Sequence, residues 1–294
     1  MAAIQSGVRV GDDEIVFAGG IDDEEKTTYV SVTRGGKKVL ELSGRDIDLD
    51  RFQGEVGLFV PDVYRAFDTI HRERVALKMP RANAYAGDEE FLHEVQVATK
   101  LQHPNILSVI NASYIDDQFV IAMELGDESL ADRIERRIST ARAMDLAGQG
   151  LAALAHAHEH RIIHCDIKPE NFILFPGNQL KLADFGFAKI SLRTLKASGS
   201  GTIDYIAPEQ AMGRPKFQSD VFSSGLVLYR MFAGKLPRWP YEWPPEGHRR
   251  LQKKLHPDMV ALIRRAIEIR PRKRYPDGLR MYGAFQRLRR RALR

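Results

Sequence analysis

Apolar and polar residues alternate in short stretches of the first part of the chain, which is the pattern of strands with one buried face. TTYVSV at 27–32 and KVLEL at 38–42 flank the glycine pair 35–36, so a β-hairpin is predicted there. Further strands are predicted at 63–67, 73–79 and 118–124, and the apolar spacing of 88–101 predicts a helix that starts near Asp88 and ends before Pro104.

After Gly126 the apolar residues recur at helical spacing instead. In 138–158 they fall on one helix face, which also includes a histidine: Met144, Ala147, Leu151, Leu154 and His158. The helix predicted at 219–234 is apolar on most faces and is therefore expected to be a buried central helix. Arginine-rich helices are predicted at about 257–270 and 278–292.

These elements predict an α+β protein with two lobes. We expect a β-rich extension of unknown role at 1–50, a small β-rich lobe with one main helix at 51–126, and a larger, mostly helical lobe at 127–294. A body with two lobes often binds its ligand in the cleft between them.

Composition narrows the class of protein. The 294 residues are 44% apolar and 28% charged, which fits a globular chain. No apolar run reaches the roughly 18–20 residues that cross a bilayer, and the first residues do not resemble a secretory signal. A single cysteine excludes an internal disulfide and fits a reducing cytoplasm.

Charge is unevenly distributed within the net value of +5. Residues 1–50 carry six basic and eleven acidic residues, whereas 269–294 carry ten basic residues and only Asp277. The basic end is either a solvated helix or a patch for an anionic partner.

The strongest chemical signal lies at 164–186. FILF and LKLA are two short strands around a Pro-Gly-Asn turn, and a hairpin of this kind brings Asn171 beside Asp184. Their oxygens suit Mg²⁺, and Asp166 and Lys168 lie just before the first strand. A carboxylate, a cation and a Mg²⁺ site at one corner are typical of phosphoryl transfer.

HCDIKPEN at 164–171 and DFG at 184–186 resemble the motifs H-R-D-x-K-x-x-N and D-F-G of eukaryotic-type protein kinases. The resemblance covers about 50–294 and implies the two-lobed kinase fold, with ATP and Mg²⁺ as cofactors. It also implies that Asp166 accepts the proton of the substrate hydroxyl, that Lys168 neutralises the γ-phosphate, and that Asn171 and Asp184 hold Mg²⁺.

VALK at 75–78 is similar to the family's V-A-I-K, and Glu94 follows 16 residues after Lys78. By resemblance, Lys78 binds the α- and β-phosphates and Glu94 steadies it. Met123 corresponds to the gatekeeper, and the backbone of Glu124 and Leu125–Gly126 to the hinge that binds adenine. The resemblance implies that three apolar side chains sandwich the adenine ring: Val63, Ala76 and Ile173.

GTIDYIAPE at 201–209 resembles the family's G-T-x-x-Y-x-A-P-E, the platform that holds a peptide acceptor. By resemblance, Asp220 should accept backbone N–H groups of the catalytic loop, and Arg274 should pair with Glu209. Lys168-Pro169-Glu170 and Thr202 resemble the Ser/Thr branch, and Phe187 favours serine as the acceptor.

Two departures from the family pattern stand out. The positions of the three loop glycines fall on Val56, Leu58 and Pro61, so we expect weaker ATP binding than in a kinase with a complete glycine-rich loop. Cys165 replaces the arginine that binds an activation-segment phosphate, so activity is expected not to need that phosphate. A nucleophilic role for Cys165 is disfavoured because the segment has no separate partner to orient His164.

Three functions remain open. The first is a Ser/Thr protein kinase that acts on protein substrates and has no nucleic-acid partner. The second is a pseudokinase that serves as a nucleotide-binding or scaffold module, motivated by the incomplete glycine-rich loop. The third is a small-molecule kinase of similar fold. The sequence does not determine the oligomeric state.

Overall fold

The computed structural model describes residues 4–10, 13–22, 27–34, 37–44, 62–68, 73–79, 95–115, 118–185, 203–238 and 241–292. It divides into two compact units, which are Met1–Phe91 with Ser108–Leu125, and Leu92–Leu107 with Gly126–Arg294. The chain passes from the first unit to the second between Leu125 and Gly126, next to the lobe boundary predicted after residue 126. Residues 92–107, which were predicted in the small lobe, group with the second, helical unit.

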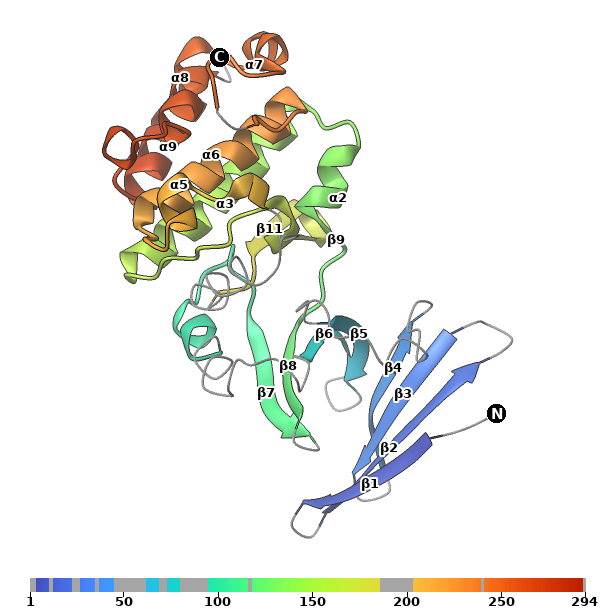
Figure 1. Ribbon diagram of the computed structural model, residues 1–294. Helices are drawn as coiled ribbons and strands as arrows, with labels where there is room; N and C mark the ends of the chain where they lie inside the picture. Colours follow the sequence, from blue (N-terminus) through green and yellow to red (C-terminus); the bar gives the residue numbers. More distant parts are fainter. Residues whose placement is uncertain are drawn as a thin grey trace. The chain divides into compact units, whose positions relative to one another are not determined.

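The first unit is built on one antiparallel sheet in the order β1-β2-β3-β4-β5-β6-β8-β7 (Figure 1). The predicted hairpin is confirmed, because Arg34 of β3 pairs with Lys37 of β4. β4 also pairs with β5, so the N-terminal strands continue the same sheet. The strands are β1 Ile4–Val10, β2 Asp13–Asp22, β3 Thr27–Arg34, β4 Lys37–Gly44, β5 Asp62–Asp68, β6 Glu73–Met79, β7 Val109–Ile115 and β8 Gln118–Glu124.

The three strands predicted at 63–67, 73–79 and 118–124 correspond to β5, β6 and β8. The sequence did not locate β1, β2 and β7. Residues 95–100 are helical, as predicted, while the expected start of that helix at 88–94 lies outside the described residues.

The second unit is mostly helical, with a small sheet in the order β11-β10-β9. Its strands are β9 Glu128–Ser129, β10 Phe172–Phe175 and β11 Gln179–Leu182. Its helices are α2 Leu130–Glu135, α3 Thr140–Glu159, α5 Pro208–Ala211, α6 Phe217–Ala233, α7 His248–Lys254, α8 Pro257–Ala266 and α9 Gly278–Ala292. Short 3₁₀ turns occur at Pro169–Asn171, Pro176–Asn178, Ile203–Tyr205 and Pro271–Lys273.

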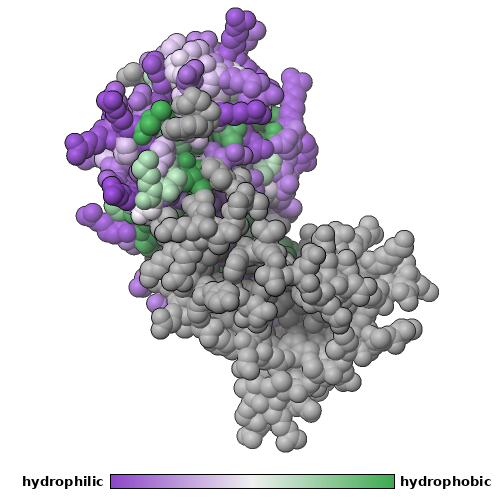
Figure 2. All heavy atoms as spheres, viewed as in Figure 1, coloured by the Kyte–Doolittle hydropathy of each residue, from purple (hydrophilic) through white to green (hydrophobic). Residues whose placement is uncertain are grey.

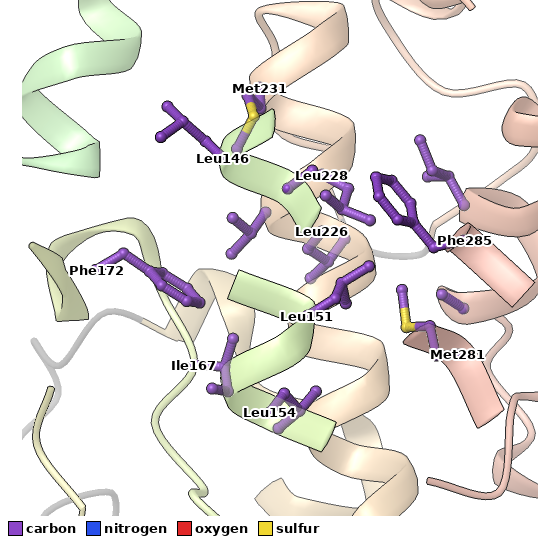
Figure 3. Packing of buried hydrophobic residues seen from close by; sticks show 14 of the residues in the cluster. Leu146, Leu151, Leu154, Ile167, Phe172, Leu226, Leu228, Met231, Met281 and Phe285 are labelled. Atoms are coloured by element: carbon purple, nitrogen blue, oxygen red, sulfur yellow. The ribbon is translucent and has the colours of Figure 1, made fainter. Parts of the chain in front are cut away.

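Helix α3 presents the predicted face to the core. Ser139 caps its start by accepting the backbone N–H of Arg142 at 3.2 Å. All five residues predicted on one face are buried: Met144, Ala147, Leu151, Leu154 and His158. Figure 3 shows Leu151 and Leu154 of α3 among side chains of α6, α9 and β10.

Helix α6 is the central helix of this unit, as its apolar pattern predicted, and fourteen of its seventeen residues are buried. A Cβ on Gly225 would lie 2.7 Å from Ile267 Cγ2, so the glycine allows the chain at the end of α8 to approach closely. The helix ends at Gly234, whose φ of 73° is the left-handed conformation that suits glycine.

The predicted helix 257–270 is too long by four residues, since α8 ends at Ala266. Pro271 requires an extended residue before it, and Arg270 has φ −80° and ψ 116°.

Arg274 is a buried cation, 2% exposed, that joins three segments of the second unit. Its guanidinium donates to both carboxylate oxygens of Glu209 at 2.6 and 3.0 Å, as the family resemblance implied. The remaining bonds go to the carbonyl oxygens of Glu268, Ile269 and Gln218, so all five of its N–H donors are used.

The surface of the second unit is rich in charge. Most of the coloured side chains on the face shown in Figure 2 are hydrophilic. In the C-terminal helices the exposed residues include Arg249, Arg264 and Arg280. None of the helices in the described part of the chain is long and apolar enough to span a bilayer.

We predict that Arg274→Lys lowers the free energy of unfolding by about 2–4 kcal/mol, because lysine cannot replace five bonds in a planar fork. Urea unfolding of the variant measures this loss. Arg272→Lys, at an exposed position two residues earlier, is the matched control and should change stability little. Equal stability of Arg274→Lys and the wild type would contradict the role given to the Arg274 network.

Candidate active site

A β-hairpin positions two of the predicted metal-binding residues. β10 and β11 pair from Phe172↔Leu182 to Phe175↔Gln179 around the turn Pro176–Asn178. Just beyond the strands, the N–H of Ala183 donates to the carbonyl oxygen of Asn171 at 2.8 Å. The hairpin predicted from the sequence is therefore present, and Asp184 is the next residue after Ala183.

Two side chains converge on one carboxylate oxygen of Asp166. Asp166 Oδ2 accepts a hydrogen bond from Asn171 Nδ2 at 2.9 Å and lies 2.9 Å from Lys168 Nζ. The same amide nitrogen donates to the backbone oxygen of Asp166 at 2.7 Å. Both amide hydrogens of Asn171 are thus directed to Asp166, and the atom that Asn171 can offer a cation is its carbonyl oxygen.

The loop before Asp166 is held by a buried carboxylate on α6. Asp220 accepts the backbone N–H of His164 at 2.8 Å and that of Cys165 at 2.9 Å, which confirms the expectation for Asp220. His158 Nε2 lies 2.9 Å from the same carboxylate, and His158 Nδ1 accepts the N–H of Gly278. Since Nδ1 is an acceptor, His158 carries its hydrogen on Nε2 and donates it to Asp220.

His164 connects this loop to the segment that contains Asp184. Its Nδ1 accepts the N–H of Asp166 at 3.2 Å, so Nε2 carries the hydrogen and donates to the Ala183 carbonyl oxygen at 2.8 Å. Its ring also meets Phe185 edge-on, with centroids 4.7 Å apart. The two segments are therefore fixed to each other through one side chain.

Cys165 is buried and has a left-handed backbone with φ 65°. Burial raises the pKa of its thiol far above the usual range, and the carboxylates of Asp220 and Asp166 raise it further. A thiol that stays protonated is a poor nucleophile, in agreement with the expectation from the sequence.

A family model described as the protein kinase domain matches residues 53–276 of this chain. The chain belongs to this family.

Several curated proteins are similar to the kinase domain. This chain is 35% identical over 187 residues to the serine/threonine-protein kinase PrkC of Bacillus subtilis, and the match covers 60% of this chain and 29% of the relative. It is 32% identical over 240 residues to the serine/threonine-protein kinase pkn3 of Myxococcus xanthus, covering 71% and 44%. It is 33% identical over 249 residues to the serine/threonine-protein kinase PknA of Mycobacterium tuberculosis, covering 74% and 55%. The chain thus spans only about a third to a half of these relatives' length.

In the first unit of the kinase domain, the strand register places four predicted nucleotide-binding residues on one sheet face. Val63 pairs with Lys78, and Ala76 pairs with Met123. Cross-strand partners and residues two apart on one strand share a face, so all four side chains do. Lys78 is 1% exposed, whereas Val63 is 58% exposed.

The predicted hinge residues lie at the end of this unit. β8 ends at Glu124, whose N–H donates to the Ser108 carbonyl oxygen at 3.4 Å, and Leu125 is the last residue of the unit. The remaining adenine-pocket candidate, Ile173, lies on β10 of the second unit and packs closely against Gly126.

The platform segment is described from Ile203 onward. Tyr205 OH accepts a hydrogen bond from Arg230 at 2.8 Å, and Arg230 also pairs with Glu135 of α2 at 2.7 Å.

Burial would raise the pKa of Glu209, but hydrogen bonds from Arg274 and Ser219 outweigh this effect and hold the pKa of Glu209 below its usual value.

Sequence reasoning did not assign roles to His158, Gln210 and Arg230. The sequence pattern could have indicated a role for His158, because a histidine on a buried helix face needs a polar partner. It gave no such indication for the other two, since their partners are distant in sequence. Several named residues lie outside the described residues: Glu94, Thr202, Phe187 and the loop positions Val56, Leu58 and Pro61.

Proposed function

We propose that this kinase domain transfers the γ-phosphoryl group of ATP to serine or threonine hydroxyls of protein substrates. The observation that carries the proposal is the carboxylate of Asp166, held by Asn171 and Lys168 beside the segment of Asp184. Membership of the kinase family and the names of its relatives, which are serine/threonine-protein kinases, support the same chemistry and acceptor.

Asp166 acts as the base in this proposal. Its Oδ2 is engaged by Asn171 and Lys168, so its orientation is set before the substrate arrives. We assign Oδ1 to the acceptor hydroxyl, whose proton it receives as the oxygen attacks phosphorus. Lys168 lies 2.9 Å from this carboxylate and neutralises negative charge on the γ-phosphate.

The residues present fit a magnesium ion. We propose that the carbonyl oxygen of Asn171 and the carboxylate of Asp184 bind it, since both are hard oxygen ligands, and Mg²⁺ usually takes one or two protein ligands together with phosphates and water. When bound, Mg²⁺ neutralises charge on the β- and γ-phosphates. Asn171 thereby serves two purposes, because its amide nitrogen orients Asp166 while its oxygen is available to the ion.

For ATP itself, we propose that Lys78 binds the α- and β-phosphates and that Glu94 steadies Lys78. The backbone of Glu124 and Leu125 binds the adenine edge beside Met123. The apolar residues that enclose the ring are Val63, Ala76 and Ile173. The shared face of Val63, Ala76, Lys78 and Met123 in the sheet supports this assignment. We place the activity in the cytoplasm, where a chain with a single cysteine is stable without disulfides.

We predict that Asp166→Asn lowers the rate of phosphoryl transfer by about 100-fold or more, because asparagine cannot accept the proton. Labelled ATP, Mg²⁺ and generic serine- and threonine-containing proteins provide the assay. Asp258→Asn, at an exposed position on α8, is the control and should keep the wild-type rate. Thermal unfolding verifies that both variants are folded.

Each other outcome of this assay contradicts part of the proposal. An unchanged rate in Asp166→Asn removes the base assignment. No transfer by the wild type favours a nucleotide-binding scaffold. When choline or an aminoglycoside replaces the protein in the assay, transfer to that small molecule and to no protein favours a small-molecule kinase.

We also predict that dephosphorylation changes the transfer rate by less than about twofold, because Cys165 supplies no cation to bind an activation-segment phosphate. The sites concerned are Ser191, Thr194, Ser198 and Ser200. Phosphatase treatment, verified by mass spectrometry, followed by initial-rate measurement tests this. A large drop that is restored by rephosphorylation would contradict it.

A further inference from the structure

Gln210 is a buried amide beneath the catalytic loop. It lies on α5, is 1% exposed, and its Nε2 donates to the backbone oxygen of Cys165. Its Oε1 is buried and has no hydrogen-bond partner among the described residues. Burying an amide with an unpaired oxygen costs free energy, but an apolar side chain would leave the Cys165 carbonyl oxygen without this donor. The amide of Gln210 is therefore present at this position for the hydrogen bond that it donates to Cys165.

The orientation of this amide follows from its partner. A reversed amide would place Oε1 against the Cys165 carbonyl oxygen, and two acceptors repel each other. Nε2 therefore faces Cys165.

The bond from Gln210 completes the support of the Cys165 backbone. The N–H of Cys165 donates to Asp220 at 2.9 Å, and its carbonyl oxygen accepts from Gln210, so the residue is held on both sides. This matters because φ is 65° at Cys165, a conformation that non-glycine residues adopt only where their surroundings impose it.

The Cys165 carbonyl belongs to the same peptide plane as the N–H of Asp166. That N–H donates to His164 Nδ1 at 3.2 Å. Holding this plane at its carbonyl end, together with the bond from the Asn171 amide to the Asp166 carbonyl oxygen, restricts the direction in which the side chain of Asp166 leaves the backbone.

The helix that carries Gln210 is itself held in place. Its neighbour Glu209 is bonded to both Arg274 and Ser219, which anchors α5 to the rest of the second unit. We propose that Gln210 is a positioning residue for Asp166, and that through it the end of the platform segment sets the geometry of the catalytic loop. The expected fall in kcat rests on the proposed function, whereas the expected effect of Gln210 on the conformation of the loop does not.

Two substitutions of Gln210 test the proposal in the full chain. Gln210→Glu keeps the shape but loses the donor when its carboxyl is ionised, and Gln210→Leu removes both polar atoms. We expect kcat to fall about ten- to a hundredfold in Gln210→Leu and in the ionised form of Gln210→Glu, with KM for ATP changed by less than about twofold, because Asp166 is misplaced while nucleotide contacts remain. Gln252→Glu, on the exposed face of α7, is the matched control and should behave as the wild type.

A pH series distinguishes positioning from a general structural defect. The introduced carboxyl of Gln210→Glu is buried beside Cys165, whose thiol is influenced by the carboxylates of Asp220 and Asp166. The cations nearby are each bound to a carboxylate already: Lys168 to Asp166, and Arg274 to Glu209. Both burial and these carboxylates favour its protonated form, which can donate to the Cys165 oxygen. The ratio of variant to wild-type kcat should therefore rise as the pH falls, while the ratio for Gln210→Leu should stay constant.

Hydrogen exchange provides a readout that does not depend on turnover. Backbone exchange in the peptide 161–168, measured by mass spectrometry, should be faster in Gln210→Leu than in the wild type. Unchanged exchange overturns the proposal, and so does faster exchange with an unchanged kcat. If the wild type transfers no phosphate, the proposed function fails, whereas exchange still decides whether Gln210 holds the loop. If Gln210→Glu does not fold, Gln210→Leu supplies both measurements.

Discussion

The candidate active site depends on one buried carboxylate, that of Asp220. It is 1% exposed and receives three hydrogen bonds, from the backbone of His164 and Cys165 and from the ring of His158. A carboxylate removed from water is costly unless such bonds replace its hydration, and here they come from the loop that precedes Asp166. The stability of the central helix and the conformation of the loop before Asp166 therefore depend on the same group.

The packing around α6 keeps that carboxylate in place. Side chains of α3, α6 and α9 meet in the core, as Figure 3 shows for Leu154, Leu226 and Met281. His158 connects the same three helices through polar contacts, since it lies on α3 and bonds to Asp220 of α6 and Gly278 of α9. Because interiors are densely packed, a displacement of α6 would be transmitted to the loop.

From the loop outward, a chain of hydrogen bonds links one residue of the site to the next. His164 links the loop to Ala183, and the hairpin returns the chain so that Ala183 bonds to Asn171. Asn171 in turn orients Asp166. The result is a site whose side chains are oriented by their own hydrogen bonds before any substrate binds, which is the preorganisation that phosphoryl transfer needs.

The sequence revealed the features that repeat or follow short spacings, and missed those that depend on distant contacts. The long elements α3, α6 and α9, and the hairpin β10–β11, were predictable from their periodicity and turn residues. Short elements such as α5 and β9 were not, because they are too short to show a period and are set by tertiary contacts.

The same distinction applies to the site. Asp166, Asn171 and Asp184 are close in sequence and could be grouped by motif. Gln210 could not, since its partner Cys165 lies 45 residues away.

The most direct test of the account is a crystal structure of the kinase domain with Mg²⁺ and a non-hydrolysable ATP analogue. We predict that Asn171 Oδ1 and the Asp184 carboxylate bind the ion, with Lys168 at the γ-phosphate and Asp166 still bonded to the Asn171 amide nitrogen. An ion bound without Asn171 and Asp184, or an Asp166 side chain turned away from the γ-phosphate, would contradict it.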